Sequence, residues 1–338
     1  MGRPLRIGVV APPWVPVPPP SYGGTELIVD ILCRGYRDAG HQPVLFASGD
    51  STCPVELRHR IERGSLPPDK YQEHSHLALV LASASPLGLD IIHSHLEAIQ
   101  PYAPSLGVPV VCTFHVDVTE ERRIFLQTNE VVRYVAVSEN QGRSFPIGVN
   151  VIHHGIELDR YQPLPEKQPY FAFLGEISRK KGADLAVRAA AELGVPVRIA
   201  GYVPPAEEEW FRREVKTRIR LGALEYLGAL GFEEKVELLG GATALLCPVR
   251  WREPFGLVAV EAMACGTPVV AMRRGALPET VEDGVTGILC DDEDEFAQAA
   301  AQVHALDPRA CRRRAEALFD SRRMVADYLK LFEKILRR

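Results

Sequence analysis

Two stretches of this sequence place charged side chains where they are costly unless something compensates them. The first is FAFLGEISRKKGAD (171–184), in which an apolar run ends at a glycine and three cations, Arg179–Lys181, lead into a helix-like segment. Positive charge at the start of a helix opposes the helix dipole by a few tenths to about 1 kcal/mol per residue. An acid, Glu176, stands at the head of the same loop.

The second stretch is EPFGLVAVEAMACGTPVVA (253–271), which reads as a loop followed by a helix that is apolar nearly all round. Such a helix is buried, yet it carries Glu261 in its middle. An unpaired buried carboxylate costs several kcal/mol, so it needs hydrogen-bond donors. Either the hydroxyls of a ligand or a neighbouring cation or backbone group can supply them, and the sequence leaves both open.

Glu253 lies eight positions before Glu261, in the loop at the helix start. The first backbone N–H groups of a helix have no partner within it. The N–H groups of Phe255, Gly256 and Leu257 therefore could point at an anion or a sugar oxygen.

Further candidates lie in the first half of the chain. Gly23-Gly24 precedes a helix pattern, and a glycine pair there lets the backbone approach an anion closely, although a plain turn and helix cap would use the same residues. His115 ends an apolar run, where a histidine is as readily structural. Four more histidines follow strand patterns, form no convincing metal set and are interpreted as structural: His93, His95, His153 and His154.

One acidic run has a D-x-D spacing with which carboxylates can bind a divalent ion. Asp291–Asp294 directly precedes the helix pattern EFAQAAAQVHAL. Acids at a helix N-terminus cap it and favour its dipole. We therefore interpret this run as a cap and expect no metal site.

The elements that must position these residues alternate along the chain. Short Val-, Ile- and Leu-rich runs alternate with helical patterns, first from LRIGVV to VNVIHHG and again from YFAFLG to TGILC, with a polar, proline-bearing stretch at 159–169 between. This rhythm predicts two doubly wound α/β domains with parallel sheets. Ligands of such folds bind beyond the carboxyl ends of the strands. The stretch 308–338 has helical periodicity.

Composition excludes several classes of protein. The 338 residues are 46% hydrophobic and 25% charged with a net charge of −5, which gives no reason to expect nucleic acid as a partner. The seven cysteines are scattered without a C-x-x-C pair, which argues against a zinc site and a secreted disulfide framework and predicts a cytoplasmic setting. Six prolines in 11–20 exclude a signal peptide, and no run is long enough to span a membrane.

The motifs together resemble those of family 4 retaining glycosyltransferases. The resemblance rests on eight segments in the family's order: PPPSYGGTELIV, DIIHSH, TFH, VAVSE, VIHHGIELDRYQP, LGEISRKKG, EPFG with EAMACGTPVVA, and RRGALPETVEDGVTG. It implies the GT-B fold, in which two Rossmann-like domains face an interdomain cleft. On this basis we expect an acceptor-side domain at 1–162, a nucleotide-sugar domain at 170–318 and a C-terminal helix at 319–338 that packs back on the first domain.

The resemblance also implies roles for single residues. Glu261 would hold the ribose hydroxyls, and Glu253 a hydroxyl of the donor sugar. Backbone N–H groups at Phe255, Gly256 and Leu257 would contact sugar and diphosphate. Lys181 would neutralise the leaving diphosphate, so that a bound dianion resolves the conflict of the cations with the helix dipole. Gly24, after Gly23, would bring its N–H beside the phosphates, and His115 would lie at the reacting sugar.

The expected activity is transfer of a hexose from a UDP- or GDP-linked sugar to a small acceptor or a glycan or lipid precursor, with retention, without metal or other cofactor. Membrane association is possible but not indicated. A nicotinamide-dependent oxidoreductase would need G-x-G-x-x-G after the first strand, and IGVVAPPWV lacks it. A GT-B sugar-nucleotide epimerase and a catalytically weak sugar-nucleotide-binding protein remain open.

Glu176 departs from the family, which usually has an arginine directly after that glycine as a second contact to the diphosphate. Arg179 and Lys180 stand where the family is not usually basic. Either the guanidinium has migrated to Arg179, with Glu176 orienting Arg179 or Lys181, or the second contact is missing. We favour migration and include Arg179 among the substrate-binding residues.

Overall fold

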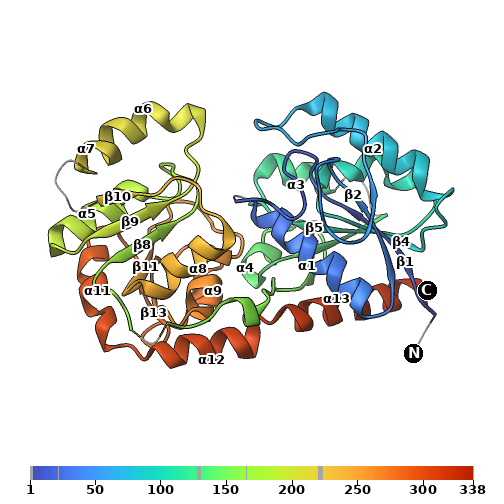
Figure 1. Ribbon diagram of the computed structural model, residues 1–338. Coiled ribbons are helices and arrows are strands. Elements are labelled where there is room, and N and C mark those ends of the chain that lie inside the picture. Colours follow the sequence, from blue (N-terminus) through green and yellow to red (C-terminus); the bar gives the residue numbers. More distant parts are fainter. Residues whose placement is uncertain (1–2, 22, 128–130, 165, 220–223, 338) are drawn as a thin grey trace. The chain divides into compact units, whose positions relative to one another are not determined.

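The computed structural model describes residues 3–21, 23–127, 131–164, 166–219 and 224–337. The chain divides into two compact units: Met1–Gly155 together with Ser321–Arg338, and Ile156–Asp320. The chain therefore enters the second unit at Ile156 and returns to the first at Ser321 (Figure 1). Each unit has a parallel sheet of its own.

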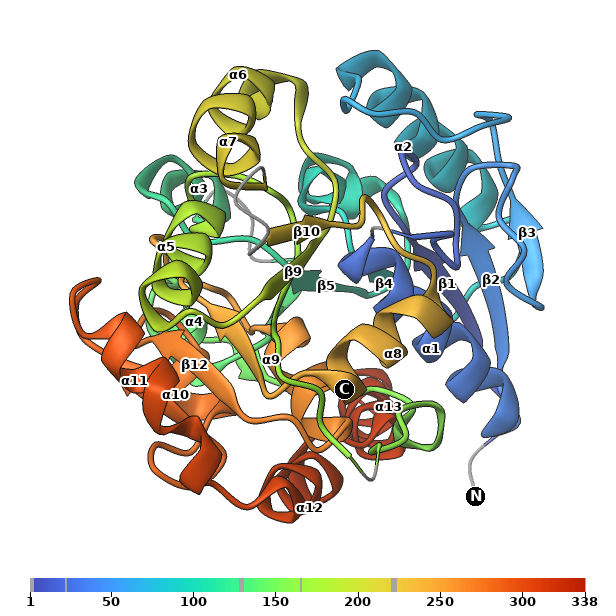
Figure 2. The ribbon, with the colours of Figure 1, turned by 60° about the vertical axis from the view of Figure 1, so that its left-hand side comes forward.

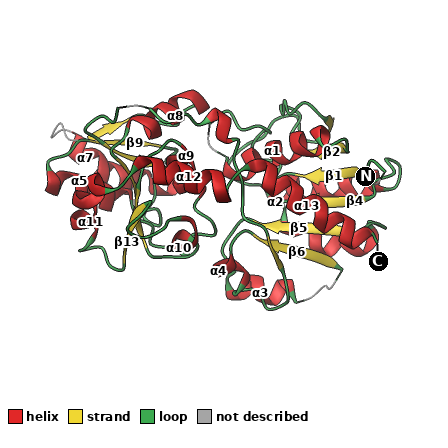
Figure 3. Ribbon diagram, turned by 90° about the horizontal axis from the view of Figure 1, so that it is seen from below, coloured by secondary structure: helices red, strands yellow, loops and turns green. Residues whose placement is uncertain are grey.

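The first unit is built on a seven-stranded sheet in the order β3-β2-β1-β4-β5-β6-β7, and every pairing in it is parallel. Its strands are β1 (Arg6–Val10), β2 (Gln42–Phe46), β3 (Glu56–Arg58), β4 (Ile91–Ser94), β5 (Val110–Phe114), β6 (Val132–Ala136) and β7 (Asn150–Val151). Its helices are α1 (Gly24–Asp38), α2 (Lys70–Ala84), η1 (Glu97–Ser105), α3 (Glu120–Leu126), α4 (Glu139–Gly142) and α13 (Ser321–Leu336). The central strands β4 and β5 are buried along their whole length, as expected for a parallel sheet with helices on both sides (Figure 3).

Helices from the two ends of the chain lie side by side in this unit. α13 packs against α1, where the ring of Phe332 lies 5.6 Å from that of Tyr36 (Figure 1). On the sheet, a buried cluster joins Leu77 and Val80 of α2 with Phe46 and Ile92. The unit is thus closed by a helix that the chain supplies only after the second unit is complete.

The second unit has a six-stranded parallel sheet in the order β10-β9-β8-β11-β12-β13. Strands β9 and β10 lie side by side at one edge of it (Figure 2). Its strands are β8 (Phe171–Leu174), β9 (Val197–Ala200), β10 (Leu224–Tyr226), β11 (Ala244–Cys247), β12 (Val269–Met272) and β13 (Gly287–Cys290). Its helical elements are η2 (Leu158–Arg160), α5 (Ala183–Leu193), η3 (Pro205–Glu207), α6 (Glu208–Trp210), the π-helical η4 (Phe211–Val215), α7 (Lys216–Ile219), α8 (Phe232–Gly241), α9 (Leu257–Ala264), α10 (Leu277–Thr280), α11 (Phe296–Gln302), η5 (Val303–Ala305) and α12 (Pro308–Leu318). The prediction of two doubly wound parallel α/β domains is confirmed.

The helical stretch at the C-terminus is two helices with a short break between α12 and α13. Phe319 in the break is buried, and its carbonyl accepts a hydrogen bond from the N–H of Ile156 at 2.8 Å. Asp320 forms an isolated parallel bridge with Ile156. These contacts join the segment where the chain enters the second unit to the segment where it leaves. The apolar periodicity of the sequence runs through the break, but the backbone there pairs with Ile156 and is not helical. Within the described ranges, no helix is long and apolar enough to cross a membrane.

Two glycines bound α5, and they differ in what surrounds them. Gly182 caps the N-terminus with φ +76°, and a Cβ there would lie 2.0 Å from the carbonyl oxygen of Pro248. Gly194 caps the C-terminus with φ +65°, and a Cβ there would meet nothing within 4 Å.

We therefore expect Gly182→Ala to destabilise the protein more than Gly194→Ala does. Both variants force alanine into the left-handed region, at roughly 1–2 kcal/mol. Gly182→Ala must in addition displace a backbone carbonyl, for a further ~1–3 kcal/mol. Urea unfolding of the two variants measures the difference, and equal midpoints would show that the Pro248 contact does not constrain this turn.

Candidate functional site

A turn after β8 carries the three consecutive cations, and Arg250 holds this turn in place. The backbone N–H of Arg250 donates to the Lys180 carbonyl at 2.8 Å, and its Nη1 donates to the Arg179 carbonyl at 3.1 Å. The same guanidinium binds Asp184 of α5 through Nη1 and Nη2 at 2.7 and 2.9 Å. It also binds Glu293 through Nε at 2.6 Å. These hydrogen bonds raise the pKa of Arg250 and lower that of Glu293.

Each of the three cations has an acidic partner. Arg179 pairs with Glu207 at 3.1 Å, and its guanidinium lies 5.5 Å from the centre of the Trp210 ring. Lys180 pairs with Glu176 at 3.1 Å. The expectation that Glu176 orients Arg179 or Lys181 is therefore wrong, because the spacing of four residues across the turn brings Lys180 to it.

The third cation, Lys181, meets a predicted site residue. Its Nζ lies 2.6 Å from Oε2 of Glu253, and the same oxygen accepts a hydrogen bond from Nε1 of Trp251 at 2.9 Å. The Lys181 ammonium also lies 4.8 Å from the centre of the Trp251 ring. Lys181 and Glu253, singled out in separate motifs, thus lie together beyond the carboxyl ends of β8 and β11. The sequence analysis missed Trp251. The available signal was its position, two residues before Glu253.

The start of α9 follows directly after Glu253. Gly256 caps it with φ +85°, so the N–H groups of Gly256 and Leu257 stand at the first positions of the helix, where it offers no acceptor. Phe255 is 3% exposed, and its ring packs edge-on against Phe319 at 5.8 Å. The buried Phe255 side chain thus holds the loop against the core of the unit, two residues before α9 begins.

Glu261 is buried in the middle of α9, as the sequence predicts, at 3% exposure. Its Oε1 accepts hydrogen bonds from Nζ of Lys235 at 2.5 Å and from the hydroxyl of Tyr161 at 2.8 Å. Burial and the adjacent carboxylate raise the pKa of Tyr161. Oε2 accepts no hydrogen bond from the described residues. Lys235 and Tyr161 therefore supply hydrogen-bond donors to Oε1 of Glu261 but not to Oε2.

In the first unit, Gly23 and Gly24 form the N-terminus of α1. A Cβ at Gly23 would lie 2.7 Å from Cβ of Pro19 and 2.9 Å from Oε2 of Glu26, so only glycine fits this turn. Glu26, in the first turn of α1, is 6% exposed, and burial raises its pKa to about 7. The sequence did not single out Glu26, because an acid in a first helical turn is ordinary.

His115 follows β5 and belongs to a group of histidines. Its Nε2 lies 2.8 Å from Nδ1 of His95, which follows β4, and its ring stacks on that of His154 with centres 5.1 Å apart. Behind them, the imidazole of His93 lies between the hydroxyls of Tyr36 at 3.0 Å and Thr113 at 2.8 Å. Burial lowers the pKa of His93 and His115 to about 3, so both are neutral at pH 7.

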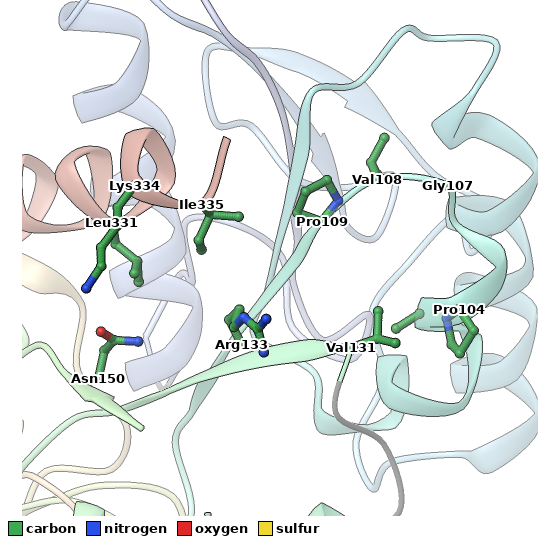
Figure 4. A pocket seen from close by; sticks show the side chains of 11 residues that line it. Pro104, Gly107, Val108, Pro109, Val131, Arg133, Asn150, Leu331, Lys334 and Ile335 are labelled. Carbon is green, nitrogen blue, oxygen red and sulfur yellow. The ribbon is translucent and has the colours of Figure 1, made fainter. Parts of the chain in front are cut away.

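A groove of about 640 Å³ lies elsewhere in the first unit (Figure 4). Its lining includes Pro109 and Val131, just before β5 and β6, together with Arg133, and Leu331 and Lys334 of α13. Pro109 and Val131 stand at the amino ends of their strands, whereas His115 follows the carboxyl end of β5. The groove is therefore distinct from the predicted site residues.

The acidic run 291–294 contacts protein groups. Oδ1 of Asp292 accepts the N–H groups of Asp294 and Glu295 at 3.0 and 3.1 Å, directly before α11. Glu293 pairs with Arg250. In the part of the chain that the structure describes, no group of three or more His, Cys, Asp or Glu side chains could hold a metal ion.

Two families match the sequence in succession. Glycosyltransferase Family 4 matches residues 22–160, and Glycosyl transferases group 1 matches residues 156–317. This chain belongs to the family 4 glycosyltransferases. Among curated relatives, D-inositol 3-phosphate glycosyltransferase of Mycolicibacterium smegmatis is 35% identical over 214 residues, which are 58% of this chain and 48% of that protein. That of Mycobacterium tuberculosis (strain H37Ra) is 34% identical over 203 residues, 56% of this chain and 42% of that protein. The chain thus spans about half the length of the curated relatives it matches.

Solved structures share the fold over nearly the whole chain. Sucrose-phosphate synthase of Thermosynechococcus elongatus superposes with a TM-score of 0.80 at 22% identity, covering 98% of this chain and 99% of that one. Anabaena HepE, in complex with UDP and glucose, gives 0.78 at 21% identity, covering 98% and 100%. The predicted GT-B fold is confirmed.

The buried Glu26 generates a pH prediction. Its pKa of about 7 in the folded state exceeds its ordinary value of 4.5, so between these pH values the folded state binds more protons than the unfolded state. Stability must therefore fall as pH rises through this window. Glu26→Gln removes the titration, and the free energy of unfolding of the variant relative to the wild type should rise by roughly 1–3 kcal/mol from pH 5 to pH 8.

Urea unfolding at the two pH values measures this difference. Glu120→Gln is the matched control, since Glu120 also lies in a first helical turn but is exposed. A pH-independent difference for Glu26→Gln would show that the carboxyl is not buried as described.

Proposed function

We propose that this protein is a retaining glycosyltransferase that moves a hexose from a UDP-linked sugar to a hydroxyl of a small polar acceptor, in the cytoplasm. The observation that carries the proposal is the contact of Lys181 with Glu253 at 2.6 Å beside the N-terminus of α9. It brings a cation and a carboxylate together beside a helix N-terminus, at the carboxyl ends of parallel strands, and folds of this class bind nucleotides at that edge. The seven free cysteines suit a reducing compartment.

Each part of a nucleoside-diphosphate sugar has a partner in the second unit. Oε2 of Glu261 is the acceptor for a ribose hydroxyl, since Lys235 and Tyr161 occupy only Oε1. The N–H groups of Phe255, Gly256 and Leu257 are donors for the diphosphate and the sugar. Glu253 accepts from a sugar hydroxyl once Lys181 turns to the diphosphate.

The reaction breaks the bond between the anomeric carbon and the diphosphate oxygen while the acceptor oxygen bonds to that carbon from the same face. The proton of the acceptor hydroxyl passes to an oxygen of the departing diphosphate, so no protein base is required. Negative charge grows on the diphosphate in the transition state, and Lys181 and the start of α9 stabilise it there. Because these groups supply the positive charge, we propose that no metal ion takes part.

In the first unit, the backbone at Gly23 and Gly24 is assigned to the phosphates and His115 to the reacting sugar. Arg179 is assigned as the second contact to the diphosphate. Its ion pair with Glu207 is weak, because the Arg179 side chain is 59% exposed and exposed ion pairs contribute about 1 kcal/mol or less. The diphosphate can therefore displace Glu207.

The choice of donor and acceptor follows the relatives. Anabaena HepE is described in complex with UDP-glucose, and the mycobacterial relatives are described as acting on D-inositol 3-phosphate. We therefore propose UDP-glucose or a closely related UDP-hexose as donor and a small polyol, free or phosphorylated, as acceptor.

A donor screen tests this function. The purified chain is incubated with UDP- and GDP-linked hexoses, each with inositol, inositol phosphate or water alone, and products are identified by mass spectrometry and anomeric NMR. A retained glycoside formed from a UDP-hexose in the presence of a chelator is expected. Inversion, a requirement for metal, or conversion of the donor to its epimer without transfer would overturn the corresponding part of the proposal.

Lys181→Ala should lower the rate of transfer by about 10² or more, the scale of losing one contact to developing charge. Lys180→Ala is the matched control, because the neighbouring lysine pairs with Glu176 instead of Glu253. Initial rates at saturating donor separate the two variants. Equal rates for wild type and Lys181→Ala would remove this lysine from the mechanism.

Glu261→Gln should weaken binding of UDP itself by about tenfold, since a hydrogen bond to a charged group contributes about 1.5–3 kcal/mol. Isothermal titration calorimetry gives the Kd, and the double variant Glu261→Gln/Lys235→Met guards against the effect of an unpaired lysine. Glu225→Gln, an exposed acid paired with Arg198, is the control. An unchanged Kd for both Glu261 variants would contradict the ribose assignment.

A further inference from the structure

A second histidine, His95, is joined to His115 in the first unit. Nδ1 of His95 lies 2.8 Å from Nε2 of His115, and His95 is 5% exposed. Its ring centre lies 4.3 Å from that of His93. Because His95 is nearly buried, its hydrogen bond to the more exposed His115 is the route by which its ring can act on a substrate.

Both rings of this pair are neutral at pH 7, because burial lowers the pKa of His95 and of His115 far below 7. A neutral imidazole donates from one nitrogen and accepts at the other. Across the 2.8 Å contact, one ring therefore donates and the other accepts. Two arrangements satisfy this rule, and they give His115 opposite tautomers.

The surroundings of His95 distinguish the two arrangements. Its Nε2 is buried and has no hydrogen-bond partner among the described residues. The neighbouring His93 cannot supply one, since both of its nitrogens are taken up by Tyr36 and Thr113. If His115 donated, the proton of His95 would stand on Nε2 as a buried N–H without an acceptor. Such orphaned N–H groups are rare in folded proteins.

We propose that His95 is a positioning residue that donates from Nδ1 to Nε2 of His115 and so fixes the proton of His115 on Nδ1. His115 then presents an N–H donor, and its basic nitrogen is occupied. The role of His115 follows: it donates a hydrogen bond to a sugar oxygen and does not remove the proton of the acceptor. This inference rests on the proposed function only in assigning His115 to the sugar.

The tautomer is measured on the full chain without substrate. Long-range ¹H–¹⁵N NMR of ¹⁵N-histidine-labelled protein at pH 7, assigned with His115→Gln, reports which nitrogen of His115 carries the proton. We expect Nδ1 to be protonated in the wild type and the proton to move to Nε2 in His95→Phe. His95→Asn, whose amide can donate in place of Nδ1, should keep the wild-type form. A proton on Nε2 in the wild type would overturn the proposal.

The kinetic readout uses the same variants. His95→Phe should lower kcat about tenfold, the scale of one hydrogen bond, with KM for the donor within about twofold, and His95→Asn should recover most of the loss. His76→Phe is the control, since His76 is a buried histidine of the same unit that contacts the Ala11 carbonyl. An unchanged kcat in His95→Phe despite a shifted tautomer would overturn the role in transfer.

The two proposals can fail separately. The expected NMR result without any transferase activity would leave the His95–His115 arrangement standing and remove the proposed function. Transferase activity together with a proton on Nε2 of His115 would leave the proposed function standing and remove the His95–His115 arrangement.

Discussion

The position of Lys181 depends on the guanidinium of Arg250. Arg250 is hydrogen-bonded to the backbone of the cationic turn, to Asp184 in α5 and to Glu293 before α11. A planar group with five N–H donors can bind in several directions at once, which a lysine cannot do. Arg250 is itself a cation, so it holds the turn through the carbonyls that it binds and through its carboxylate partners. These hydrogen bonds hold the backbone of the turn that carries Lys181.

Carboxylates of the second unit compensate the cations of the turn. Lys181 is paired with Glu253 and Lys180 with Glu176, so the cations that oppose the dipole of α5 are compensated in the absence of ligand. Glu253 is only 12% exposed, and a partly buried carboxylate without a partner would be costly. In the proposed exchange of Lys181 from Glu253 to a diphosphate, Glu253 keeps the hydrogen bond from Trp251, and a sugar hydroxyl takes the place of the lysine.

The sequence predicted the fold and the burial of Glu261 because both follow from local patterns. Alternating strand and helix periods gave the two sheets, and an acid inside an apolar helix gave the buried Glu261. The partners of these residues were missed because they come from distant segments: Arg250 reaches Asp184 across 66 positions, and Tyr161 reaches Glu261 across 100. Glu176 was assigned the wrong partner because the geometry of the turn, and not the family pattern, decides which of three adjacent cations lies beside it. The tautomer of His115 could not be predicted at all, since it depends on what surrounds a different histidine.

The two units handle charge in opposite ways. In the second unit the candidate residues form acid–base pairs, as suits a site for a charged diphosphate. In the first unit the histidines near His115 are neutral, because burial lowers the pKa of each ring and positive rings would repel one another. A sugar in transfer develops positive charge at the anomeric carbon, and a cationic histidine beside it would oppose that change. A neutral N–H donor can orient the sugar without this penalty. Neutral histidines thus suit the proposed contact with a sugar, as the paired charges of the second unit suit the proposed contact with a diphosphate.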